Sequence, residues 1–455
     1  MRGFTLALRV LAATLFPILE QSHVSTSGTR EAEKVLEVTS ERLVATDPQD
    51  RPMVEPHLAV DPNNLNHWLA AVIVIRPDMS GSDCASLVSF DAGKTWARRD
   101  FGHAECGDPW VGFLPNGTAL LAVLATKTSK EEQQLLVYRS IDGGRVWAEP
   151  VSLGMGHDHE TFAVPQKGSQ KEDAVFVTSA QSALDKASSK VLDSIFVASS
   201  GDGGKTFPSS TNYFFSQLPK NAMNPALLPD GTLLIAFSEF GRTDLDGFVR
   251  LGREHNWLLK SRDGGKSFLP PTLTNESCGK TWDWLAFDNS MGPFRGRLYW
   301  LCTNSSYEDV LLQYSPDGGE RWSKPIPANR RSGNNPYTRT PMMAVSQEGA
   351  VGVAWYDGRI NKQSFRGPFR CQEVYFTASL DGGETFLPEA RVSSEASCPV
   401  SQKNGDVGFR FPAGGDYMGL AAGEKGEFHL LWSDSRSGIY QLWTATVRVS
   451  DKPRP

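Results

Sequence analysis

The chain has 455 residues, of which 40% are hydrophobic, and this is enough to bury a large core. Its 46 basic and 52 acidic residues give a formal net charge of −6, which offers no bulk attraction to nucleic acid or to an anionic membrane. We therefore exclude both partners, and no later stretch is long and apolar enough to span a bilayer.

The first 27 residues have the pattern of a signal peptide. Arg2 and Arg9 precede an apolar stretch from Val10 to Leu19, and a segment rich in Ser and Thr follows. Six cysteines occur as three pairs of sequence neighbours, as expected in an oxidising compartment. The expected bridges are Cys84 to Cys106, Cys278 to Cys302, and Cys371 to Cys398. The chain is thus predicted to be secreted or periplasmic.

One octapeptide pattern recurs six times along the chain. The copies are SFDAGKTW, SIDGGRVW, SGDGGKTF, SRDGGKSF, SPDGGERW and SLDGGETF, beginning at Ser89, Ser140, Ser200, Ser261, Ser315 and Ser379. Their aspartates lie 51 to 64 residues apart, a period that suits one four-stranded blade with its loops. The aspartate can accept hydrogen bonds from turn amides, and the glycine allows the turn.

Two apolar runs precede each copy, and the first run of each pair predicts an inner strand. In chain order these strands begin near Glu55, Asp108, His159, Asn224, Asp283 and Arg339, and a seventh begins near Asp416. The seventh unit has no octapeptide, so its outermost strand must come from elsewhere. The segment 34–44 can supply it and hide the sheet edges. We predict an all-β, seven-bladed propeller of four-stranded antiparallel blades, forming one domain over residues 35–450.

The octapeptides resemble the Asp boxes, or BNR repeats, of the sialidase-like superfamily, S-x-D-x-G-x-T-W. The resemblance implies that each box joins a blade's third and fourth strands, on the face opposite the active site. Familiar sialidases have six blades, so a six-bladed propeller is the alternative fold. Where that family has an R-I-P signature, this chain has Glu55, Pro56 and His57.

Long connections are expected on the other face, at 180–192, 239–256, 327–338, 358–371 and 394–415. Long loops on a rigid scaffold commonly bind ligands. Three second strands end alike in an acid followed by an arginine: Glu239 with Arg242, Asp357 with Arg359, and Asp434 with Arg436. These arginines could clamp a substrate carboxylate, or they could be structural braces paired with nearby acids.

The resemblance implies a tyrosine nucleophile assisted by a glutamate, an aspartate acid/base and arginines on a substrate carboxylate. Tyr417, Tyr356 and Tyr337 are the available phenols. Candidate catalytic residues are Asp357, Glu55, Asp108, Glu160, Asp283 and Tyr417. Candidate substrate-binding residues are Arg242, Arg339, Arg359, Arg436, His57, Trp110 and Trp284.

These features predict a secreted, monomeric exo-glycosidase that removes a terminal acidic sugar, sialic or uronic acid, from a glycan. The alternative is a non-catalytic propeller that binds glycan or protein. We expect no cofactor, although the acid-lined channel could hold calcium, and His157 and His159 beside Glu160 are the weaker option for a transition metal.

Overall fold

A computed structural model of the chain describes residues 34–451 except 46, 48, 129, 170, 219, 246–247, 275–282, 305, 331–336, 362–369 and 400–404. The predicted signal peptide lies outside these residues. The described chain forms seven antiparallel sheets, and no helix within it is long and apolar enough to cross a membrane.

Each blade begins with its innermost strand and adds the next strands outward. The inner strands are β3 (Met53–Asp61), β7 (Glu105–Phe113), β11 (His157–Ala163), β15 (Lys220–Leu227), β19 (Trp284–Phe287), β23 (Thr338–Val345) and β27 (Gly419–Ala422). The second strands are β4 (Asn64–Ile75), β8 (Ala119–Thr126), β12 (Val175–Asp185), β16 (Leu233–Leu245), β20 (Leu298–Thr303), β24 (Val351–Asp357) and β28 (Glu427–Asp434).

The third strands are β5 (Ser82–Ser89), β9 (Gln134–Ser140), β13 (Lys190–Ser200), β17 (Phe248–Ser261), β21 (Val310–Ser315), β25 (Glu373–Ser379) and β29 (Gln441–Asp451). The outer strands are β6 (Ala97–Asp100), β10 (Val151–Met155), β14 (Ser209–Tyr213), β18 (Thr272–Leu273), β22 (Ile326–Pro327), β26 (Ala390–Arg391), and β1 (Lys34–Val38) with β2 (Arg42–Ala45).

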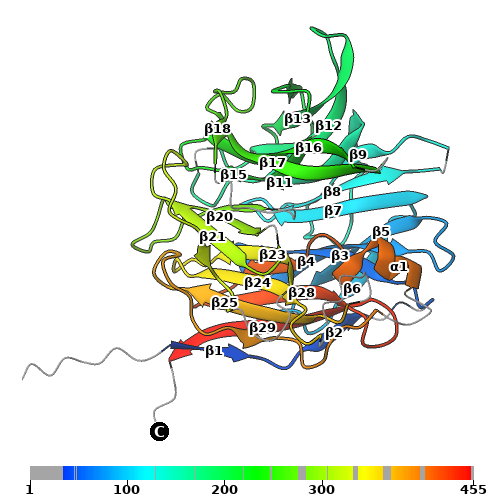
Figure 1. Cartoon of the computed structure of the whole chain (residues 1–455). Helices are drawn as coiled ribbons and strands as arrows, with labels where there is room; N and C mark the ends of the chain where they lie inside the picture. The colour runs from blue at the N-terminus through cyan, green and yellow to red at the C-terminus, as the bar shows by residue number, and fades with distance from the viewer. Residues whose placement is uncertain are drawn as a thin grey trace, which may run out of the picture.

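The ring closes through its two chain ends. Each inner strand packs against the next around the centre, and β27 packs against β3. In the last blade, β1 and β2 both pair with β29, from Lys34 opposite Asp451 to Arg42 opposite Thr444. Figure 1 shows the dark blue β1 beside the red β29. The seven-bladed prediction and its closure by the N-terminal segment are confirmed, and the six-bladed alternative is excluded.

The Asp boxes join the third and outer strands of six blades, as the resemblance implied. In one box, Asp202 accepts hydrogen bonds from the Ser200 hydroxyl at 2.7 Å, from the Lys205 amide at 3.0 Å, and from the Thr206 amide and hydroxyl at 3.0 and 2.7 Å. The Ser200 hydroxyl also accepts the amide of Gly204 at 2.9 Å. Each box is therefore a self-contained turn that ties its own side chains to its own backbone.

Two connections predicted as loops, 180–192 and 239–256, are extensions of β-hairpins. Strands β12 and β13 stay paired up to Asp185 opposite Lys190, and β16 and β17 up to Leu245 opposite Phe248. The β12–β13 arm rises above the ring in Figure 1. Pairing satisfies the backbone groups of a long excursion, which a loop would leave to solvent. The connection 394–415 instead contains a short helix, α1 (Gly405–Arg410), and a 3₁₀ turn, η1 (Pro412–Gly414).

The Asp boxes should differ in their contribution to stability. Burial alone would raise the pKa of Asp202, but hydrogen bonds from Thr206 and Ser200 outweigh it and lower this pKa to about 2. At pH 7, Asp202→Ala should therefore reduce the free energy of unfolding by about 1 kcal/mol. Asp142→Ala should cost less, because Val146 in that box has no hydroxyl to bond to the carboxylate. Urea unfolding of both variants measures the difference.

The same pair gives a pH test. Because the folded pKa of Asp202 lies below its ordinary value of 3.8, its stabilisation is complete above about pH 4 and is lost as the pH falls through 2. The difference in the free energy of unfolding between the wild type and Asp202→Ala should become smaller over that pH range. A difference that stays constant down to pH 2 would contradict the role given to the carboxylate.

Candidate active site

Among the described residues, the inner strands of five blades contain a β-bulge near their first residues. The pairing of each strand shifts register across two residues, which are Glu55–Pro56, Asp108–Pro109, His159–Glu160, Met223–Asn224 and Thr340–Pro341. In four of these bulges the first residue is left-handed, with φ of 54° at Glu55, 48° at Asp108, 53° at His159 and 54° at Thr340. Non-glycine residues in this region are uncommon and gather at functional sites.

In three of these bulges the second residue is proline. In the other two it is Asn224 or Glu160, whose side chains can form hydrogen bonds. The Asn224 amide bridges to the next inner strand, donating to the Leu285 carbonyl at 2.6 Å and accepting the Leu285 amide at 2.8 Å. Glu160 is 1% exposed, and neither of its carboxyl oxygens has a hydrogen-bond partner among the described residues. A buried carboxyl without partners is costly for folding, which favours a functional role for Glu160.

An aromatic plug, formed by His57, Trp110, Trp284 and Tyr417, lies where the inner strands meet. The Trp110 ring stacks on His57 at 3.6 Å and on Trp284 at 5.3 Å between centroids, and it meets Tyr417 edge-on at 5.9 Å. Burial lowers the pKa of His57 to about 3, and the neutral ring accepts the Val111 amide at Nδ1. The plug joins four blades and leaves the Tyr417 hydroxyl buried without a hydrogen-bond partner in the described structure.

Carboxyl groups surround the plug. Burial and the neighbouring Asp108 and Asp416 raise the pKa of Glu55 well above its usual range, even though Glu55 accepts the Asp416 amide at 3.1 Å. Burial and Asp108 likewise raise the pKa of Glu160, and burial with Glu55 raises that of Tyr417. Acids that perturb one another in this way are typical of acid–base sites.

A narrow cavity of about 30 Å³ lies beside the plug. It brings together six of the predicted site residues: Asp108, Trp110, Glu160, Asp283, Trp284 and Tyr417. The other lining residues are His159, Thr161, Ala222, Met223 and Asn224. Sequence reasoning noted His159 but missed the β15 residues; the N-P dipeptide at Asn224 was the available signal for a strand irregularity there.

Asp283 is also tied to its own blade. It is 1% exposed and accepts the Trp300 indole N–H at 3.0 Å. The same indole-to-acid contact recurs between Trp355 and Asp357 at 3.0 Å and between Trp432 and Asp434 at 3.1 Å. Asp357, predicted as catalytic, is therefore held by contacts within its own blade.

Two of the four arginines predicted to bind substrate turn toward the outer strands. Arg359 bonds to Asp357 at 2.6 Å and to Glu389, beside β26. Arg436 bonds to Asp434 at 2.6 Å and to Glu41, between β1 and β2. Both are braces within a blade, the alternative that the sequence left open.

The other two arginines predicted to bind substrate differ. Among the described residues, Arg339 has one ion pair, with Asp416 at 3.9 Å, and no second carboxylate holds it. Arg242 lies in β16, but its side chain is outside the described part of the structure.

The structure also places the two other candidate tyrosines and the two histidines that were considered for a metal. The Tyr356 hydroxyl donates to the Ser433 carbonyl and accepts the Ser433 amide, both at 3.1 Å, so this phenol is structural. The Tyr337 ring packs under the Arg370 guanidinium at 4.3 Å. His157 and His159 do not point together as a regular strand would have them, because the bulge intervenes and His157 is hydrogen-bonded to Ser179 at 2.8 Å.

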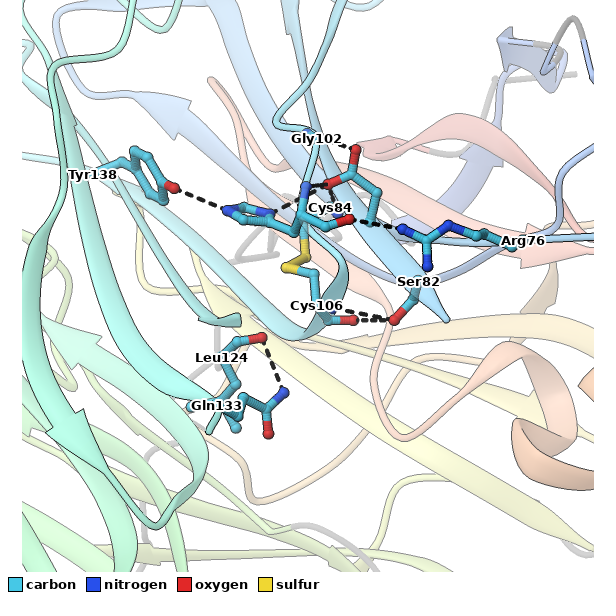
Figure 2. Close-up of a disulfide and its surroundings, with 10 residues drawn as sticks. Arg76, Ser82, Cys84, Gly102, Cys106, Leu124, Gln133 and Tyr138 are labelled. Carbon is cyan, nitrogen blue, oxygen red and sulfur yellow. Dashed lines mark hydrogen bonds and ion pairs between the residues drawn. A yellow bond between two sulfur atoms is a disulfide. The ribbon is translucent and has the colours of Figure 1, made fainter. Parts of the chain in front are cut away.

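The disulfides brace the face that carries the mouth. Cys84 is bonded to Cys106 and Cys371 to Cys398, as predicted. Cys302 is also disulfide-bonded, and its expected partner Cys278 lies outside the described residues. Figure 2 shows how Ser82, Arg76 and Tyr138 surround the first bridge: the Ser82 hydroxyl donates to the Cys106 carbonyl at 2.7 Å, and Tyr138 bonds to His103 at 2.9 Å. Such bridges indicate an extracytoplasmic protein.

The chain resembles propellers of known structure. An α-L-arabinofuranosidase from Fusarium graminearum, solved with an iminosugar inhibitor, matches with a TM-score of 0.52 and 11% identity over 90% of this chain and 98% of that one. A protein of unknown function from Dyadobacter fermentans matches with a TM-score of 0.51 and 13% identity over 91% and 99%.

A Hadza microbial sialidase matches more weakly, with a TM-score of 0.46 and 14% identity over 84% and 76%. No protein-family model and no curated protein matches the sequence. At these identities the likeness shows the fold alone, which is that of a β-propeller.

Gly415 should control the position of Glu55. Its φ is +120°, and a Cβ there would lie 2.0 Å from the Glu55 Cγ. Gly415→Ala should therefore displace the Glu55 side chain and reduce the free energy of unfolding by about 1–3 kcal/mol.

Gly438 is the matched control, because its φ is +96° and nothing lies within 4 Å of a Cβ at that position. Gly438→Ala tests the backbone strain alone. Denaturant unfolding of both variants measures the difference, and equal losses would show that Gly415 does not make room for Glu55.

Proposed function

We propose that the chain is a secreted or periplasmic glycoside hydrolase whose reaction takes place beside the aromatic plug. The observation that carries this proposal is the Tyr417 hydroxyl, buried and without a hydrogen-bond partner in the described structure, among the carboxyl groups of Glu55, Asp108 and Glu160. The disulfides support an extracytoplasmic location, and the leader-like residues 1–27 support export.

The arrangement suits covalent catalysis by a tyrosine. The Tyr417 oxygen attacks the anomeric carbon while its proton passes to Glu55, and the bond from that carbon to the leaving oxygen breaks. The leaving oxygen takes a proton from a carboxyl group of the same acid cluster. Water then attacks the anomeric carbon and gives a proton to the carboxylate that had protonated the leaving oxygen. The bond between this carbon and the Tyr417 oxygen breaks, the sugar is released, and Glu55 returns its proton to the phenolate. The raised pKa of Glu55 makes its carboxylate a stronger base for the phenolic proton.

The sugar is best explained as uncharged. Arg359 and Arg436 are each held by two carboxylates, so they are not available to a substrate. Among the described side chains, the carboxyl groups around the plug outnumber the arginines, and this charge disfavours an anionic ligand. We therefore propose a neutral terminal sugar as the first substrate class.

A fluorogenic panel of a neutral arabinofuranoside, a sialoside and a glucuronide tests the activity. Turnover of the neutral substrate should fall at least 100-fold in Tyr417→Phe and in Glu55→Gln. Tyr314→Phe is the control, because Tyr314 lies in β21 and contacts Arg297 away from the plug. Glycan binding without turnover of any of the three substrates would instead favour the non-catalytic alternative.

Arg339 favours a second candidate, the terminal acidic sugar. Among the described residues its guanidinium has one ion pair, with Asp416 at 3.9 Å, so it can still contact a substrate carboxylate. If the substrate is acidic, Arg339→Gln should raise KM for the sialoside or glucuronide about tenfold or more and leave the arabinofuranoside unaffected. An equal effect on all three substrates would exclude a specific carboxylate contact.

A further inference from the structure

A cluster of three side chains lies between the second and third blades, on the rim of the cavity beside Glu160. Asp108 comes from β7, and Asp158 and His159 come from β11. One ligand atom from each, two carboxylate oxygens and an imidazole nitrogen, all lie within 4.8 Å of one another. Ligand atoms on a common zinc ion lie up to about 4 Å apart, because each bond is about 2 Å long. A small rotation of the exposed Asp158 side chain closes the remaining gap.

The β-bulge makes this convergence possible. Neighbouring residues in a regular strand point to opposite faces, so Asp158 and His159 would normally diverge. The register shift after Asp158 and the φ of 53° at His159 break this alternation. The His159 amide then donates to Asp108 at 3.3 Å, and its imidazole lies 3.5 Å from the Asp158 carboxylate.

Glu160 is the independent observation that points to a ligand site. It follows His159 directly, its side chain lines the same cavity as Asp108 and His159, and both of its oxygens are buried without partners in the described structure. The cavity of about 30 Å³ holds one water or one ion, whereas sites for drug-sized ligands measure roughly 300 Å³ or more.

The local charge points the same way. Asp108 lies near the carboxylates of Asp158 and Asp416, and Glu160 lies near those of Asp108 and Asp158. A cation among these groups would offset the repulsion that they now share.

We propose that Asp108, Asp158 and His159 bind a divalent transition-metal cation, with the Glu160 carboxyl facing it, and that this ion links the second and third blades at the channel mouth. One imidazole with carboxylates suits Zn²⁺ or Mn²⁺, whereas Ca²⁺ prefers an all-oxygen set. The site shares Asp108 with the acid cluster of the proposed reaction, but none of its three ligands is Tyr417 or Glu55, and its metal binding can be tested without glycoside turnover.

Calorimetric titration of the chelator-treated full chain with Zn²⁺ or Mn²⁺ alone tests the proposal. One ion should bind per chain, and saturating metal should raise Tm, because a ligand bound by the folded state stabilises it. Asp158→Asn and His159→Asn should each weaken binding at least 100-fold, which exceeds the typical effect of changing an outer partner of a ligand. The Asp158 side chain is exposed, and asparagine tolerates the left-handed backbone at position 159, so both variants should fold.

Asp185→Asn is the matched control, since this partly exposed acid lies at the tip of the same blade's hairpin and outside the cluster. It should bind the metal as the wild type does. The proposal is wrong if neither Zn²⁺ nor Mn²⁺ binds to the wild type. It is also wrong if binding persists in Asp158→Asn and His159→Asn. Both readouts are independent of glycoside turnover, so a failure here is distinguishable from a failure of the proposed enzyme.

Discussion

The fold depends on the antiparallel pairing of the two chain ends. Lys34–Val38 pair with the last residues of β29, and Arg42–Ala45 pair with its beginning. Without this pairing the last blade would expose the edge of β29, and the ring would lose the contact that holds its ends together. Arg436 reinforces the closure, because its guanidinium joins Asp434 of β28 to Glu41 of the N-terminal segment.

A closed ring brings the first residues of seven inner strands to one place, and the bulges decide how their side chains are used. A regular strand would alternate its side chains between faces. The bulge at Glu55–Pro56 sets the Glu55 carboxyl beside Asp416, and the bulge at His159–Glu160 gathers Asp158 and His159 near Asp108. Glu160 stands where three other blades have proline, so the propeller's repeat is broken where the buried acid is found.

Charged side chains have two separate roles in this protein: some join strands within a blade, and others surround the aromatic plug. The braces at Arg359 and Arg436 each bind two carboxylates and link a second strand to an outer strand. In the part of the chain that the structure describes, the acids around the plug have no comparable set of cations, and burial keeps the pKa values of Glu55 and Glu160 high. Such a cluster is costly for folding, and a substrate, a proton or a metal ion can offset that cost.

The sequence by itself determined the repeat, the seven blades, the closure and two of the disulfide pairings, because these follow from local patterns: turn-forming octapeptides, apolar runs and cysteine order. It also indicated Asp108, Glu160, Trp284 and Tyr417, since each stands at the start of an inner strand or just before one. Only the tertiary structure decided which charged groups are free to act. Whether Arg359 meets a substrate or Glu389, and whether His159 points with His157 or toward Asp108, depends on contacts and strand irregularities that a linear pattern does not encode.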